Sequence, residues 1–171
     1  MPDLIIRIKK KTDGAAALSC IRADGSTTWQ RQEGQLGRFF PLHDLTHYAV
    51  ESVLELPRAF YGLLAEGWDI TDFEKPGTRE SIPPDAGFAE LIVGYFDVER
   101  ATGFRPNAND YNEKAEAYYR DKSLTPPSLR LSDEQLGRIR QLRAELFARW
   151  NALPPGDVLE LTFDRGAGSA V

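Results

Sequence analysis

The sequence predicts an α+β fold, in which a small antiparallel sheet is covered by about five helices. Three observations predict it: strand-like segments near the N-terminus, segments with helical hydrophobic spacing through the middle, and one alternating segment near the C-terminal end. The two kinds of segment differ in period, which is two residues for a half-buried strand and 3.6 for a helix. A chain of 171 residues can bury one substantial core, so we expect a single domain over 1–163 and a flexible tail at 164–171.

The first thirty residues predict a three-stranded meander. Residues 4–8 are apolar and β-branched, and 16–22 and 27–32 follow as further strand-like segments. The turn signals Asp13-Gly14 and Asp24-Gly25 separate them. We therefore expect three antiparallel strands, a meander to which the segment near the C-terminal end can be added.

The middle of the chain predicts helices at 41–55, 58–67, 84–102, 109–122 and 132–152. Pro41 suits a first helical turn, because its missing N–H would be unpaired there, and Pro57 separates the first two helices. Gly103 is a stop signal for the third helix. Ser132, followed three residues later by Gln135, is a capping-box signal that starts the last helix.

Two segments complete the expected fold. Residues 158–163 alternate between apolar and polar side chains, which is typical of a strand with one buried face. Since the other strand-like material is N-terminal, we expect this strand in the same sheet. The stretch 68–84 contains Pro76-Gly77 and Pro83-Pro84, and we expect an ordinary long loop there in preference to an active-site lid.

Composition and charge argue against several classes of function. The net charge of −5 and the pI of about 5.1 disfavour general attraction to nucleic acid or to an anionic membrane. No stretch has the apolar length of a membrane span. The single cysteine, Cys20, allows no intramolecular disulfide, and the first residues carry no secretory segment. We expect a cytoplasmic protein with no nucleic-acid and no membrane partner, folding alone or as a small homo-oligomer.

His43 and His47, the two histidines of the chain, are the residues that indicate chemistry. They lie four residues apart on a predicted helix, so they share one face about 6 Å apart, as two imidazoles must to bind one metal ion. They also flank the apolar stripe of that helix, where an imidazole needs a hydrogen-bond partner or a metal. The spacing predicts a site for one divalent, zinc-like ion. The alternative is a pair of structural histidines, each bonded to a carbonyl or a carboxylate.

A metal ion would need a third ligand, and several carboxylates could supply it. Glu51 lies one turn beyond His47 but two turns from His43, which strains a set on one straight helix. Glu66 fits better if the second helix folds back against the first. Glu90 or Asp97, on the helix after the long loop, could serve instead.

The string His43-Asp44-Leu45-Thr46-His47 resembles the H-E-x-x-H pattern of zincin metalloproteases, with Asp44 in place of the glutamate that acts as general base. It is also similar to the H-D-x-x-H pattern of a coenzyme Q biosynthesis family, whose motif carries a glutamate twelve residues after the second histidine. Ala59 stands at that position here. Each resemblance covers five residues and implies a divalent metal on this helix.

The first function that fits is a small metal-dependent enzyme of hydrolytic type. A metal-bound water of lowered pKa would be its nucleophile. Asp44 would orient a histidine or the attacking water. The expected metal ligands are His43, His47 and either Glu66 or Glu51.

The second function is that of a non-enzymatic interaction or regulatory domain, in which both histidines are structural. Its working surface would be the aromatic and acidic region over 68–119, with exposed aromatic side chains such as Trp68 and Tyr111. Binding that survives chelation would separate it from the enzyme. Tyr111, Tyr118 and Tyr119 are at a spacing that also fits a core-facing stripe.

Overall fold

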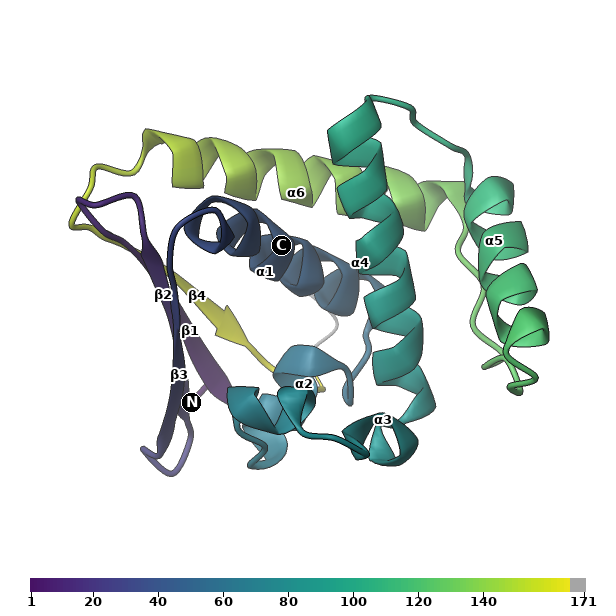
Figure 1. The fold of residues 1–171 in the computed structure, drawn as a ribbon, viewed down its shortest axis with the longest axis horizontal. Helices are drawn as coiled ribbons and strands as arrows, with labels where there is room; N and C mark the ends of the chain where they lie inside the picture. Colours follow the sequence, from purple (N-terminus) through teal and green to yellow (C-terminus); the bar gives the residue numbers. More distant parts are fainter. Residues whose placement is uncertain (167–171) are drawn as a thin grey trace.

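Helices cover one face of a four-stranded antiparallel sheet (Figure 1). The computed structural model describes residues 1–166, apart from the side chains of residues 79 and 80. The strand order is β3-β2-β1-β4, which confirms the α+β prediction and the place of the C-terminal strand in the meander's sheet. The strands are β1 (Leu4–Lys10), β2 (Ala16–Arg22), β3 (Thr27–Gln32) and β4 (Val158–Phe163).

Strand β1 is central and pairs with neighbours from both ends of the chain. Ile6 lies opposite Cys20 of β2 on one side and Leu161 of β4 on the other. All three side chains are buried under the helices. The alternate residues face outward, where Arg7 forms an ion pair of 2.7 Å with Glu160. The two-residue period of the sequence therefore divides the sheet into a buried and an open face.

Five helices of seven residues or more account for the predicted helical segments: α1 (Leu36–Leu54), α2 (Phe60–Glu66), α4 (Pro84–Thr102), α5 (Ala108–Asp121) and α6 (Asp133–Ala152). The stretch expected to be irregular contains two short elements, η1 (Ile70–Glu74) and α3 (Thr78–Ser81). Two capping predictions are confirmed. Gly103 ends α4 with a positive φ of 75°, and the Ser132 hydroxyl accepts a hydrogen bond of 3.1 Å from the Gln135 N–H.

Helix α1 begins five residues before the predicted start, so that Pro41 lies inside the helix. Its ring removes the N–H that would bond to the Gly37 carbonyl. The early turn is anchored by packing: a Cβ on Gly37 would come within 2.8 Å of the Gln32 and Gly14 carbonyl oxygens. Only a glycine permits this close approach to the sheet. The contact explains why the helix begins before Pro41, the predicted start.

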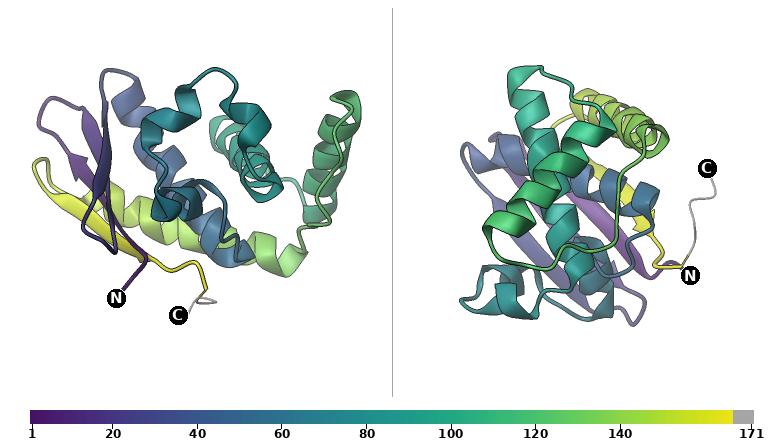
Figure 2. Two further views of the ribbon diagram at one scale, coloured as in Figure 1. Left: turned by 90° about the horizontal axis from the view of Figure 1, so that it is seen from below. Right: turned by 90° about the vertical axis from the view of Figure 1, so that its right-hand side faces the viewer.

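Helices α4 and α6 pack against α1, and α5 lies farthest from the sheet (Figures 1 and 2). A buried carboxylate ties three of these helices together. Glu99 of α4 receives two hydrogen bonds from Arg140 of α6, at 2.6 and 3.2 Å, and one from the Tyr111 hydroxyl of α5, at 2.9 Å. These charge-assisted bonds hold α4 with one face directed at α1.

The prediction that Tyr111 belongs to an exposed aromatic surface is wrong. Its side chain is 1% exposed, because α5 turns it inward onto Glu99 and Phe96. Tyr119 is also buried, whereas Tyr118 is 40% exposed. The helical spacing of these tyrosines therefore belongs mainly to the core.

The N-terminus lies beside the end of β4 (Figure 2). The Asp3 N–H donates to Asp164, and the Arg165 N–H donates to Asp3, at 3.0 and 2.9 Å. Of the tail predicted at 164–171, residues 167–171 lie outside the described residues. Among the helices of 1–166, none is long and apolar enough to cross a membrane.

Candidate metal centre

His43 and His47 lie on the side of α1 that faces α4, with ring centroids 4.9 Å apart. Glu90, on α4, is the third member of the group. One ligand atom from each of the three residues lies within 4.8 Å of the other two. The His47 Nε2 and the Glu90 Oε1 are 3.3 Å apart. Packing of α1 against α4 thus brings together three metal-ligating side chains from distant parts of the sequence.

The other nitrogen of each imidazole faces a carboxylate. The His43 Nδ1 lies 2.6 Å from the Asp97 Oδ2, and the His47 Nδ1 lies 3.3 Å from the Glu51 Oε1. An ionised carboxylate only accepts hydrogen bonds, so each Nδ1 carries the hydrogen. When the ring is neutral, this arrangement leaves the Nε2 lone pair for a metal ion.

The group is buried on one side and open on the other. His47 is 2% exposed, and the Glu51 side chain is fully buried, with its Oε2 accepting the Tyr61 N–H at 2.9 Å. The Glu90 side chain is 50% exposed. Solvent and solutes therefore reach the group from the side of Glu90.

The nearby charges shift several pKa values. Burial alone would lower the pKa of His47, but the charge of Glu90 and the hydrogen bonds with Glu51 and Glu90 raise it to about 10. Burial raises the pKa of Glu51, against the influence of His47. Burial also acts to raise the pKa of Asp97, but the hydrogen bonds and charges of His43 and Arg100 bring it below the usual value. Without a metal, His47 is thus a cation between carboxylates, and a bound ion would have to displace its proton.

Asp44 faces the end of β3. Its side chain is buried, and its Oδ2 accepts a hydrogen bond of 2.8 Å from the Gln32 Nε2. Burial raises its pKa to about 6, although Gln32 and the charges of His43 and His47 oppose the shift. Asp44 is therefore close enough to influence both histidines electrostatically, but it is not one of the three grouped ligands.

Glu66 and Glu51, the two carboxylates expected as the third ligand, are not in the group that Glu90 forms with the histidines. Glu66 pairs with Arg58 at 3.0 Å and with Arg165 at 3.5 Å, and it lies outside the group although α2 contacts α1. Glu51 contacts the Nδ1 of His47. Ala59, at the position of the glutamate in the coenzyme Q biosynthesis motif, is buried and has no ligand atom.

Aromatic rings from α1 and α2 lie against the two imidazoles. Phe39 stacks on His43 with centroids 5.3 Å apart, and Phe60 lies 5.1 Å from His47. The guanidinium of Arg100 lies 5.3 Å from the centre of the Phe39 ring. These rings surround the imidazoles with apolar surface, which strengthens electrostatic interactions within the group.

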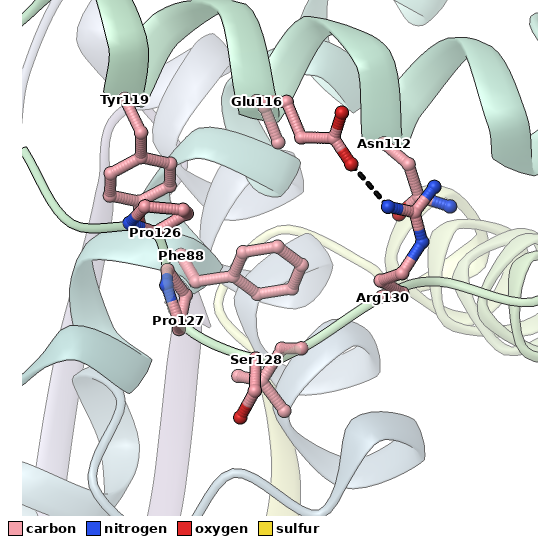
Figure 3. Close-up of a pocket in the computed structure, with 10 residues that line it drawn as sticks. Phe88, Asn112, Glu116, Tyr119, Pro126, Pro127, Ser128 and Arg130 are labelled. Atoms are coloured by element: carbon pink, nitrogen blue, oxygen red, sulfur yellow. Dashed lines mark hydrogen bonds and ion pairs between the residues drawn. The ribbon is translucent and has the colours of Figure 1, made fainter.

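A separate cavity of about 370 Å³ lies between α4, α5 and the segment 126–130 (Figure 3). Its walls are mostly apolar, and Glu116 pairs with Arg130 at its edge (Figure 3). None of the three grouped ligands lines it. Its apolar walls include Phe88, Tyr119, Pro126, Pro127 and Leu129.

Two imidazoles and a half-exposed carboxylate form a donor set that suits zinc and similar divalent ions. The acidic neighbours Asp97, Glu51 and Asp44 add negative charge that favours a cation. Comparison with family models, with curated proteins and with solved structures finds no match to this chain, and its function is therefore inferred from the chemistry of this group.

Proposed function

We propose that the chain is a metal-dependent enzyme of hydrolytic type, with one zinc-like divalent ion held by His43, His47 and Glu90. The observation that carries the proposal is the convergence of three ligand atoms from two packed helices. Two donors bound at about 2.0–2.1 Å to a tetrahedral ion lie about 3.4 Å apart. The 3.3 Å between the His47 Nε2 and the Glu90 Oε1 matches that separation. Rotation of the half-exposed Glu90 side chain, with small shifts of the two imidazoles, would close the wider separations.

The number of ligands favours a catalytic ion over a structural one. Structural zinc sites almost always have four protein ligands, whereas catalytic sites keep three and a water molecule. The group found among the described residues has three, and it opens to solvent beside Glu90. An ion held by these residues would act as a Lewis acid and would lower the pKa of a water molecule to about 7, which would suit hydrolysis at a carbonyl or phosphoryl centre.

The remaining residues support this chemistry in different ways. Asp44 contributes negative charge above its pKa of about 6, and the hydrogen bond from Gln32 favours that ionised form. The Phe39 and Phe60 rings limit the access of water to the imidazoles. Glu66 has no role in the proposal, because Arg58 and Arg165 hold it elsewhere.

The first test is the metal content of protein purified without an affinity tag, measured by elemental mass spectrometry. We expect about one ion per chain in the wild type, loss of the ion in His43→Ala and His47→Ala, and weaker retention in Glu90→Gln. Glu66→Gln is the matched control, because it neutralises an ion-paired glutamate outside the group and should leave the content unchanged. Absence of any ion, with no stabilisation by added Zn²⁺, Co²⁺ or Mn²⁺, would return both histidines to a structural role.

The second test is hydrolysis of a panel of chromogenic carboxylic and phosphoric esters. Turnover should disappear on chelation and return on adding back the ion. A bound ion whose removal unfolds the protein, with no turnover of any ester before its removal, would instead indicate a structural site.

A further inference from the structure

We infer that Asp97 and Glu51 are positioning residues, which fix both imidazoles with Nε2 directed at the ion. This inference rests on the proposed function, since it concerns the same metal group. It assigns a role to two carboxylates that are not themselves ligands. Each lies on the Nδ1 side of its histidine, at 2.6 Å from His43 and 3.3 Å from His47.

Asp97 is itself held in place on the His43 side. Its second oxygen, Oδ1, accepts a hydrogen bond of 3.2 Å from the Arg100 Nη2. The Arg100 guanidinium lies over Phe39, whose ring stacks on His43. Asp97, Arg100, Phe39 and His43 thus form a closed set of contacts that restrains the imidazole at its edge and on its face.

Glu51 is fixed more tightly, because its side chain is completely buried. A buried carboxylate is costly unless both oxygens are hydrogen-bonded. Here Oε1 faces the His47 Nδ1, and Oε2 accepts the Tyr61 N–H at 2.9 Å. The Tyr61 hydroxyl in turn donates to the backbone carbonyl of Asp44, at 3.0 Å. The start of α2 therefore holds Glu51 against His47.

The two arrangements have the same chemical result. Each imidazole has its Nδ1 against a carboxylate, which keeps the hydrogen on that nitrogen. Once His47 has lost its second proton to a bound ion, both rings have the tautomer that leaves Nε2 for the metal. A carboxylate on the far nitrogen also makes the imidazole a stronger donor to the metal, and removal of such a partner typically lowers metal affinity about 10–100-fold. The His47 Nε2 lies 3.3 Å from the Glu90 Oε1, and a ring nitrogen of His43 lies within 4.8 Å of a ligand atom of each.

The test is the affinity of the full chain for Zn²⁺, measured in competition with a chromophoric chelator, with the visible spectrum of the Co²⁺ form as a second readout. Asp97→Ala should lower the affinity about 10–100-fold. Asp97→Asn should lose less, because the amide oxygen still accepts from Nδ1. Each amide keeps only one accepting oxygen, but Glu51→Gln should lose more than Asp97→Asn. The Glu51 side chain is fully buried, so a new NH₂ group facing the Tyr61 N–H would have no water to bond with. Glu160→Gln is the control, since that carboxylate pairs with Arg7 on the open face of the sheet.

The outcomes separate the two proposals. Affinity losses in the order given, with altered Co²⁺ spectra and unchanged circular dichroism in chelator, support the positioning roles. Should Glu51→Gln fail to fold, the Asp97→Ala and Asp97→Asn pair still decides, because Asp97 is partly exposed. A wild type that binds one ion, with Asp97 variants that bind within about twofold of it and give the same spectrum, overturns the positioning inference alone. A wild type that binds no ion overturns both.

Discussion

At the scale of single residues, the buried polar side chains near the two histidines have hydrogen-bond partners, with the exception of one atom of Gln32. Its Nε2 donates to Asp44, but its Oε1 is buried without a hydrogen-bond partner. A buried acceptor left unpaired costs about 1–3 kcal/mol. A neutral partner in place of the Asp44 carboxylate would have a hydrogen to offer. Ionised Asp44 is therefore destabilising because of its burial, and the Gln32 hydrogen bond offsets only part of that cost.

Asp44→Asn is expected to raise the free energy of unfolding of the metal-free protein above pH 6 and to change it little below pH 4. The folded-state pKa of about 6 lies above the ordinary value of 3.8. The folded protein thus binds the Asp44 proton more tightly than the unfolded chain does. The wild-type free energy of unfolding therefore falls as the pH rises from about 4 through 6, because Asp44 loses this proton. Two pKa units set an upper limit of about 3 kcal/mol.

Urea unfolding in chelator at pH 4, 5, 6 and 7 measures this effect. Asp72→Asn is a useful control, because its exposed carboxylate has a pKa below the usual value and should not show the same profile. An equal gain for Asp44→Asn at pH 4 and pH 7 would contradict the assignment.

The histidine pair could be predicted because both residues lie on one helix, where spacing alone sets their separation. The placement of Glu90 beside them depends on how α4 packs on α1, and it remained one alternative among several in the sequence. Glu66 was favoured by assuming that α2 folds back on α1. That contact exists, but the Glu66 carboxylate pairs with Arg58 and Arg165 and is not among the grouped ligands. No local sequence pattern gives the positions of these two arginines.

At the scale of single elements, glycines inside helices differ in whether a side chain would fit. At Gly94 of α4 and Gly137 of α6, an added Cβ meets no atom within 4 Å. At Gly62 of α2 it would lie 2.1 Å from the Pro57 carbonyl oxygen. Close packing of the chain before α2 thus requires glycine, whereas the other two positions do not.

Gly94→Ala and Gly137→Ala should each stabilise the protein by about 0.5–1 kcal/mol, because alanine restricts the unfolded chain and favours the helix. Gly62→Ala should instead destabilise it, since backbone atoms would have to move. Chemical denaturation of the three variants at one pH gives the comparison. A Gly62→Ala protein as stable as the wild type would mean that the segment at Pro57 shifts freely.

Most elements could be predicted from period and capping residues, and the exceptions have tertiary causes. The capping box at Ser132 and the stop at Gly103 are local, and both were correct. Pro41 was placed in the first turn by the local preference of proline. The start of α1 lies earlier, at Leu36, because Gly37 packs against the backbone of Gly14 and Gln32. Proline preference in the local sequence does not reveal this tertiary contact.

At the scale of the whole molecule, β4 completes the sheet as one of its two edge strands and covers part of the core. Leu161 is 7% exposed and faces the helices, whereas Val158, on the same strand, is 42% exposed on the open face. Leu161→Ala should lower the free energy of unfolding by about 2–5 kcal/mol through lost burial and the resulting cavity. Val158→Ala should cost less than about 1 kcal/mol. Urea titrations compare the two, and equal losses would show that β4 contributes through its backbone pairing alone.

The position of β1 between β2 and β4 has a consequence for the way the chain folds as it is made. The meander can form early, but one side of β1 keeps unpaired N–H and C=O groups until residues 158–163 leave the ribosome. At about 5–20 residues per second, this delay is on the order of ten seconds. Nascent chains therefore carry an open central strand for most of their synthesis, and fragments that stop short of β4 should pair with one another through it.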